Sequence, residues 1–125
     1  MTCPCGTGLP YEACCGPFHV GAPAPTPEAL MRSRYSAFAR QLPSYLLSTW
    51  HPTTRPKRLV LDPEQEWLGL VVLSATGGFL DTEGFVEFRA TWRQRGVTDV
   101  LHERSRFVRD EGRWFYVKDH PIRGA

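Results

Sequence analysis

The sequence predicts an α+β fold in which helices precede a curved antiparallel sheet, with a short cysteine-rich segment in front of both. Three observations lead to this prediction. All four cysteines lie between residues 3 and 15, apolar residues recur with helical spacing over residues 27–41, and apolar and polar residues alternate from residue 84 onward. The 125 residues, 42% of them hydrophobic, are enough for one domain with a single core.

The cysteine-rich segment predicts a metal site. Its cysteines are spaced as Cys-x-Cys, then eight residues, then Cys-Cys, among several glycines and prolines. Such a segment cannot form a regular helix and is too short to bury a core, so something other than packing must order it. Four thiolates complete the tetrahedral shell of a zinc ion and leave no position for water, which is typical of a structural site. The predicted ligands are Cys3, Cys5, Cys14 and Cys15.

Several alternatives to this site stay open in the sequence. The four cysteines could form two disulfides in any of three pairings, although nothing ahead of Cys3 resembles a secretory signal and a reducing cytoplasm disfavours disulfides. A redox-active thiol pair lacks the usual Cys-x-x-Cys spacing. His19 could replace Cys15 as the fourth ligand, and the residue pattern does not distinguish zinc from iron.

The cysteine-rich segment resembles the SEC-C zinc motif, and the chain as a whole resembles the bacterial YchJ-like family. The motif is read as CPCGTGxxYxxCCG, and its ligands fall on the four cysteines. The wider resemblance lies in PFH at residues 17–19, TPEALMRSRYSAF at residues 26–38 and HERSRF at residues 102–107. It implies a SEC-C zinc knuckle over residues 1–19, a linker over 20–26 and a nuclear transport factor 2-like (cystatin-like) cone over 27–125. The resemblance implies the fold rather than a biochemical activity.

Three helices are expected before the sheet. Thr26 provides an N-cap oxygen and Pro27 fits the first turn, which predicts a helix over residues 27–41. Its apolar stripe would be Met31, Tyr35, Phe38 and Leu42, and its outward residues would be Arg32, Ser36 and Arg40. A second helix is expected from Pro43, and Asp62-Pro63-Glu64 predicts a brief third one.

Four strands are expected after residue 66. Residues 67–75 are apolar enough for a strand buried on both faces, and residues 84–94 alternate between apolar and polar side chains. Two tight turns then separate strands expected over residues 98–109 and 113–118. Strands joined by short turns are antiparallel neighbours, and a twisted sheet of this size curls around a helix laid on its inner face.

The interior of the curled sheet is a second candidate site. Glu103 alternates in phase with the apolar residues of its strand and should point inward, where a buried carboxylate needs a partner. We expect that partner to be Arg34. His51 could be a general base oriented by Glu103, but a lone histidine in a proline-rich loop is more often a loop residue, so no catalytic residue is assigned. The expected lining is Arg34, Tyr35, Trp50, His51, Trp92, Glu103, Trp114 and Tyr116.

Together these features predict a zinc-binding protein-interaction or adaptor module whose knuckle faces a protein partner. The alternative is a small-molecule-binding or enzymatic cone domain with a cavity near Arg34, His51 and Glu103. The net charge of +2 gives little attraction to nucleic acid. Because no apolar run reaches the roughly 20 residues of a membrane span, we expect no membrane partner and a cytoplasmic location.

Overall fold

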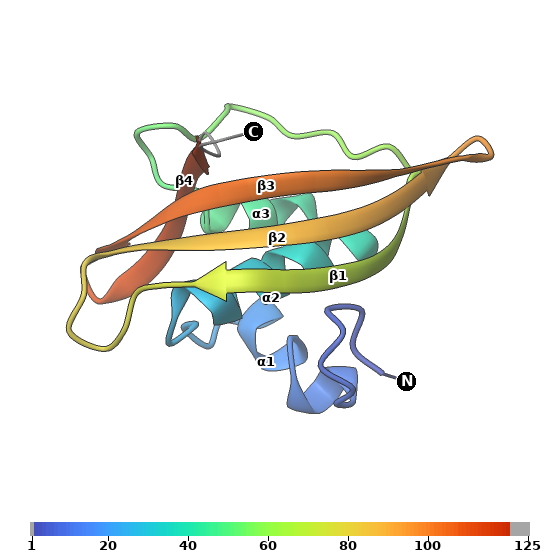
Figure 1. Ribbon diagram of the computed structural model, residues 1–125. Coiled ribbons are helices and arrows are strands. Elements are labelled where there is room, and N and C mark those ends of the chain that lie inside the picture. The colour runs from blue at the N-terminus through green and yellow to red at the C-terminus, as the bar shows by residue number, and fades with distance from the viewer. Residues whose placement is uncertain (1, 121–125) are drawn as a thin grey trace.

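The computed structural model describes residues 2–120, and helices precede the four strands as the sequence predicts (Figure 1). The cysteine-rich segment was expected to contain no helix, but it forms two short helical turns, because its prolines lie before or in the first turn of each, where they are tolerated. They are the 3-10 helix η1 (Tyr11–Ala13), α1 (Gly16–His19), α2 (Pro27–Ala39), α3 (Pro43–Ser48), β1 (Glu66–Ala75), β2 (Glu83–Gln94), β3 (Val97–Asp110) and β4 (Arg113–His120). Residue 1 of the expected knuckle and residues 121–125 of the expected cone lie outside the described residues. Within residues 2–120, no helix combines the length and apolar character needed to cross a membrane.

The four strands form one antiparallel sheet in the order β1-β2-β3-β4. The β2–β3 ladder runs from the Glu83–Val108 pair to the Gln94–Val97 pair, which fixes the register across the centre of the sheet. Figure 1 shows α2 and α3 on one face of the curved sheet and the N-terminal segment beside α2. The alternating residues Val86, Phe88 and Ala90 are buried, as their period predicts. The α+β fold class is therefore confirmed.

Helix α2 begins as predicted and ends slightly early. The Oγ1 of Thr26 accepts a hydrogen bond from the backbone N–H of Ala29 at 3.1 Å, which caps the helix. The helix was expected to reach residue 41, but Gln41 has a φ of +59°, in the left-handed region that ends helices. Leu42 therefore lies outside α2 and starts the turn into α3.

Two predictions about the middle of the chain are wrong. The expected third helix is a single turn, in which the Asp62 carboxylate accepts the backbone N–H of Glu64 at 2.9 Å, and β1 starts directly afterwards at Glu66. Strand β1 is also not buried on both faces. It lies at the edge of the sheet and packs against helices on one side only, so Leu68 and Val71 stay exposed.

The core of the domain continues into the cysteine-rich segment. A single cluster of buried side chains joins the segment, α2 and the sheet. Its members are Cys3, Cys5, Cys15, Leu30, Met31, Tyr35, Val86, Phe88, Ala90, Phe107 and Trp114. The segment therefore packs on α2 as part of the same core, although it precedes the domain in the sequence.

Candidate functional site

Residues 2–19, called the knuckle here, form tight turns that aim four sulfurs at one point. The backbone N–H of Cys3 donates to the carbonyl of Leu9 at 2.8 Å, which folds the start of the knuckle back on itself. Gly6 and Gly8 lie inside this loop with φ values of +88° and +84°. Side chains other than glycine avoid that region, so the two glycines allow the loop to close.

The adjacent cysteines diverge because the backbone bends sharply between η1 and α1. Cys14 has a φ of −127° and a ψ of −99°, outside both the helical and the extended regions. Gly16 follows at the start of α1, where an added Cβ would lie 2.9 Å from the carbonyl oxygen of Tyr11. A glycine at this position therefore lets the chain turn tightly enough for both Cys14 and Cys15 to face the same point.

The four sulfurs form a cluster of the size that a tetrahedral metal ion requires. They all lie within 4.8 Å of one another. The Cys5 and Cys14 sulfurs are 3.5 Å apart, and those of Cys14 and Cys15 are 4.0 Å apart. A zinc ion with bonds of about 2.3 Å to four sulfurs needs separations of about 3.8 Å between them. All four cysteines are free thiols, so the two-disulfide alternative is not what the structure contains.

Without a cation, the four neighbouring sulfurs cannot all be thiolates, because their negative charges would repel one another. The hydrogen bond with Cys15 lowers the pKa of Cys5 to about 4, and the same contact raises the pKa of Cys15. Burial raises the pKa of Cys14. The sulfurs thus favour one thiolate among thiols when they are alone, whereas a bound divalent cation stabilises all of them as thiolates.

Hydroxyl groups around the cluster can donate to these thiolates. The Oγ of Ser36 lies 3.4 Å from the sulfur of Cys3, and the Oγ1 of Thr7 lies 3.1 Å from the sulfur of Cys14. Such outer contacts orient metal ligands and strengthen metal binding. Ser36 comes from α2, so the helix of the cone contributes directly to the candidate metal site of the knuckle.

The face of α2 that was predicted to point into solvent carries the knuckle instead. Ser36 is fully buried. Arg32 donates from Nη1 to the carbonyl of Cys5 at 2.8 Å, and the guanidinium of Arg40 lies 3.9 Å from the ring centre of Tyr11. The prediction is wrong for Ser36, and Arg32 is only half-exposed, because the knuckle was treated as a separate unit; Arg40 is exposed, as predicted, and contacts the knuckle from the edge. We call Arg32, Ser36 and Arg40 the seat of the knuckle.

His19 is not a substitute ligand in this arrangement. Its Nε2 lies 2.8 Å from the carbonyl of Ser33 and must donate to it, so the Nδ1 accepts from the hydroxyl of Tyr11. Burial lowers the pKa of His19, which favours this neutral ring. Both nitrogens are engaged and neither has a lone pair left for a metal. The side chain fastens α1 to α2.

Removal of the Ser36 hydroxyl should weaken metal binding without disturbing the fold. For Ser36→Ala we expect an affinity for zinc about 10-fold lower than that of the wild type, because one donor to the thiolates is lost. Competition with a chromophoric chelator measures this affinity. Ser48→Ala, at an exposed serine of α3, is the control and should bind zinc as the wild type does. Equal affinities for both variants would contradict a role for the hydroxyl.

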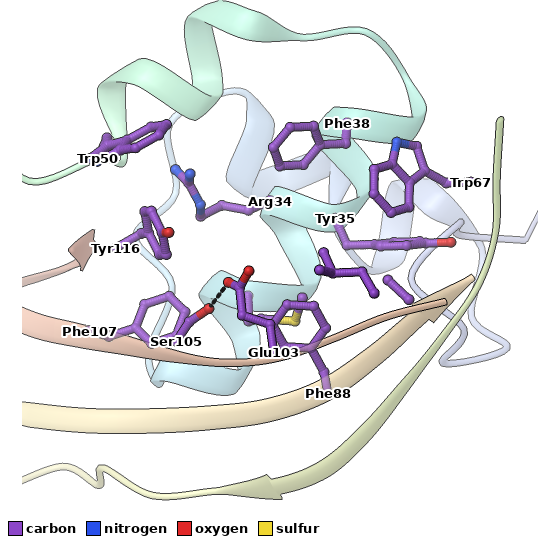
Figure 2. A pocket seen from close by; sticks show the side chains of 13 residues that line it. Arg34, Tyr35, Phe38, Trp50, Trp67, Phe88, Glu103, Ser105, Phe107 and Tyr116 are labelled. Atoms are coloured by element: carbon purple, nitrogen blue, oxygen red, sulfur yellow. Dashed lines mark hydrogen bonds between the residues drawn. The ribbon is translucent and has the colours of Figure 1, made fainter. Parts of the chain in front are cut away.

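The second candidate site is a cavity of about 280 Å³ between α2, the segment that follows α3 at Trp50, and the concave face of the sheet (Figure 2). Most of its wall is apolar or aromatic, and Arg34 and Glu103 are the two charged residues among the described residues that line it. The full lining is Met31, Arg34, Tyr35, Phe38, Trp50, Trp67, Phe88, Ala90, Leu101, Glu103, Ser105, Phe107 and Tyr116. This is the interior of the curled sheet where the sequence places a candidate site.

Three of the eight residues expected to line the cavity lie elsewhere. Arg34, Tyr35, Trp50, Glu103 and Tyr116 do line it. Trp114 packs in the core and borders a separate groove with Phe18 and His19. Trp92 pairs with Trp67 and Asp99 in the sheet, but among these residues only Trp67 lines the cavity.

His51 lies outside the cavity because its backbone is hydrogen-bonded to β4. Its N–H donates to the carbonyl of Tyr116 at 2.7 Å. The ring turns away and contacts Thr53 Oγ1 at 2.7 Å and Asp110 Oδ2 at 3.1 Å. The expected pairing of His51 with Glu103 is therefore wrong, and the geometry gives His51 no access to the cavity.

The expected ion pair between Arg34 and Glu103 is also absent from the described residues. Nη1 of Arg34 donates to the carbonyl of Leu46 and to Oγ1 of Thr49, both at 2.7 Å, so the guanidinium is held by α3. Glu103 accepts a hydrogen bond from Ser105 at 2.6 Å. Burial raises the pKa of Glu103 and lowers the pKa of Arg34 to about 10. Two opposite charges thus face one cavity, each held by its own element.

Comparisons with known proteins agree with this arrangement. The family model of the SEC-C motif matches residues 2–17, and that of the YchJ middle NTF2-like domain matches residues 26–119. The chain is 57% identical to a UPF0225 protein of Streptomyces coelicolor over 117 residues, which is 92% of this chain and 91% of that protein. A UPF0225 protein of Chromobacterium violaceum is 50% identical over 121 residues, or 92% of this chain and 89% of that protein.

Two solved structures have the same fold over almost the whole chain. The solution structure of a SEC-C motif-containing protein from Rhodopseudomonas palustris has a TM-score of 0.84 and 36% identity, and the match covers 98% of this chain and 99% of that one. The crystal structure of a SEC-C motif-containing protein from Psychrobacter arcticus has a TM-score of 0.78 and 29% identity, with 98% and 85% covered.

Proposed function

Because the chain belongs to the YchJ family and carries both a SEC-C motif and an NTF2-like domain, we propose that it binds one zinc ion and serves as a protein-interaction module. The observation that supports the zinc site is the cluster of four sulfurs within 4.8 Å of one another. Four thiolates suit zinc and leave no open position, so the ion would be structural. Free thiols of this kind persist in a reducing compartment, and the proposal places the protein in the cytoplasm.

The zinc would hold one side of the knuckle as a fixed surface. Cys3, Cys5 and Cys15 are buried against α2, whereas residues 6–10 on the other side of the loop are exposed. Leu9, the large apolar residue of this strip, is 50% exposed. A loop fixed by metal bonds loses little conformational freedom when a partner binds, and this favours affinity. The proposed partner is a protein that contacts residues 6–10.

Purification of the full chain from cells under mild conditions tests both parts of this proposal. Native mass spectrometry should show one zinc ion per chain, and another metal in that position would overturn the zinc assignment. One protein should co-elute in a fixed ratio with the wild type and be lost with Leu9→Asp. Val60→Asp is the control, because Val60 is 80% exposed in the loop before β1. If no protein co-elutes, or if both variants lose it equally, the interaction module is refuted.

A second candidate function is the binding of a small molecule in the cavity. The supporting observation is that Arg34, only 6% exposed, faces a largely apolar cavity without a contacting carboxylate among the described residues. Buried charges are normally paired, and a pocket with an apolar wall and a few polar groups is typical of a ligand site. In this case the zinc would stabilise the wall of the pocket through α2.

A further inference from the structure

We propose that the cavity binds a small molecule with an aromatic body, a carboxylate that Arg34 recognises and a hydroxyl or amino group that donates to Glu103. This inference rests on the second candidate function, the small-molecule site. It adds the chemical class of the ligand. The two charged residues leave hydrogen-bonding atoms unused, and the wall of the cavity limits the size and chemistry of what can reach them.

Arg34 offers donors that the protein leaves available. Its guanidinium uses Nη1 for both hydrogen bonds to α3, and within residues 2–120 neither Nε nor Nη2 has an acceptor. The group lies 4.5 Å from the ring centre of Tyr116 and 5.3 Å from that of Trp50. Figure 2 shows it held between these two rings. The remaining donors form a rigid fork of the kind that binds a carboxylate through two parallel hydrogen bonds.

Glu103 offers an acceptor on the adjoining wall of the same cavity. Its Oε2 accepts from Ser105, while Oε1 has no donor among the described residues. In Figure 2 the carboxylate rises from β3 toward the space beside Arg34 without contacting it. A ligand that carries only an anion would be repelled by this carboxylate. A ligand that also donates a hydrogen bond would satisfy both residues at once.

The separation of the two charges is itself an argument for a ligand. A buried arginine and glutamate that served only to hold the fold would gain most by contacting each other, because two desolvated charges are costly when they are apart. Here α3 holds Arg34 and β3 holds Glu103, so neither can move to the other without losing its own hydrogen bonds. A ligand that contacts both residues would give each buried charge a partner.

The wall of the cavity sets the size and the shape of this molecule. A volume of about 280 Å³ equals roughly nine waters at about 30 Å³ each, enough for a ligand with one aromatic ring. The rings of Phe38, Trp67, Phe88 and Phe107 surround the space and favour a flat apolar body by edge and face contacts. Leu101 lines the cavity while 38% exposed, which places an opening beside it.

Three related probes separate the contributions of the two polar groups. Isothermal titration calorimetry with the zinc-loaded full chain would compare 3-phenyllactate, which has the ring, the carboxylate and the hydroxyl, with 3-phenylpropionate, which lacks the hydroxyl. The third probe, 3-phenylpropane-1,2-diol, lacks the carboxylate. We expect 3-phenyllactate to bind most tightly and each of the others to bind about 10-fold more weakly, because each leaves a buried charged group without its hydrogen bond.

Variants assign these preferences to the two residues. Arg34→Met should remove the advantage of the carboxylate probes. Glu103→Gln, which keeps an acceptor for Ser105, should bring 3-phenylpropionate and 3-phenyllactate within about 2-fold of each other. Leu101→Trp should block the opening and weaken all three probes, and it alters no charged group if Arg34→Met fails to fold. Arg89→Met, at an exposed arginine of β2, is the control and should change nothing.

The outcomes distinguish failure of the inference from failure of the small-molecule function. If all three probes bind with equal affinity and Leu101→Trp blocks them, the cavity binds small molecules but the polar recognition is refuted. If the diol alone binds, the same conclusion holds. If no probe binds at concentrations on the order of 10 mM, both the inference and this small-molecule function are overturned.

Discussion

The Cys15→Ser chain is expected to lose stoichiometric zinc binding and to unfold at a temperature at least about 10 °C below that of the wild type. Cys15 is 1% exposed and belongs to the core cluster that joins the knuckle to α2. Structural zinc sites supply about 10–16 kcal/mol of binding free energy. Because the cone keeps most of its own core, we expect only about 3 kcal/mol of this to appear in the unfolding free energy, which corresponds to that change in melting temperature. Calorimetry and native mass spectrometry measure the two effects.

Removal of the metal from the unaltered chain provides the matching control. Wild-type protein treated with a strong chelator should melt close to the temperature of the Cys15→Ser chain, and added zinc should restore the wild type only. A variant that still carries one zinc ion per chain would contradict the four-thiolate site. So would a wild-type melting temperature that the chelator leaves unchanged.

The Gly84→Ala chain is expected to lose about 3 kcal/mol of unfolding free energy, at the upper end of the range for overpacking. Gly84 lies in β2 where the β1–β2 hairpin meets the start of α2. An added Cβ would lie 2.3 Å from the carbonyl oxygen of Thr76 and 2.6 Å from Cγ of Pro27. Thr76 also donates its backbone N–H to the carbonyl of Phe85 at 2.8 Å, so Thr76 cannot move away from the added Cβ without breaking a hydrogen bond of the hairpin. Chemical denaturation measures the loss.

Gly69→Ala is the matched control for this substitution. Gly69 also lies in a strand, but an added Cβ there meets no atom within 4 Å. We therefore expect a change below about 0.5 kcal/mol, as for a substitution that creates no clash. Equal losses for Gly69→Ala and Gly84→Ala would contradict the close packing of the hairpin on Pro27 as the cause, because removing the conformational freedom of a glycine by itself stabilises the folded state.

Local signals in the sequence predict most of the fold, because helix caps and the alternation of strands are set by residues that are close together in the chain. The cap at Thr26 and the alternation along β2 both appear as expected. The four cysteines also come together as their clustering in the sequence predicts. The failed third helix at Asp62 shows the limit of such signals, since a capping residue followed by proline is also compatible with a single turn.

The remaining errors concern contacts between elements that are far apart in the chain. The period of α2 indicates one buried stripe, but the helix has a second buried face, on which the knuckle packs. Ser33, Ser36 and Ala37 are small residues on neighbouring turns, a pattern that allows close approach of another segment and could have suggested this face. The anchoring of Arg34 by the end of α3 depends on the angle between two helices, which no local pattern specifies.

The contacts between the knuckle and its seat on α2 mean that the motif is not a structurally independent unit. The knuckle contacts a hydroxyl and two guanidinium groups that are more than twenty residues away in the chain, at Cys3, Cys5 and Tyr11. Residues 2–17 grafted onto an unrelated protein would keep their sulfurs but lose this support. A graft that is meant to hold its metal as firmly must therefore include a helix with a serine and two arginines at the spacing of Arg32, Ser36 and Arg40.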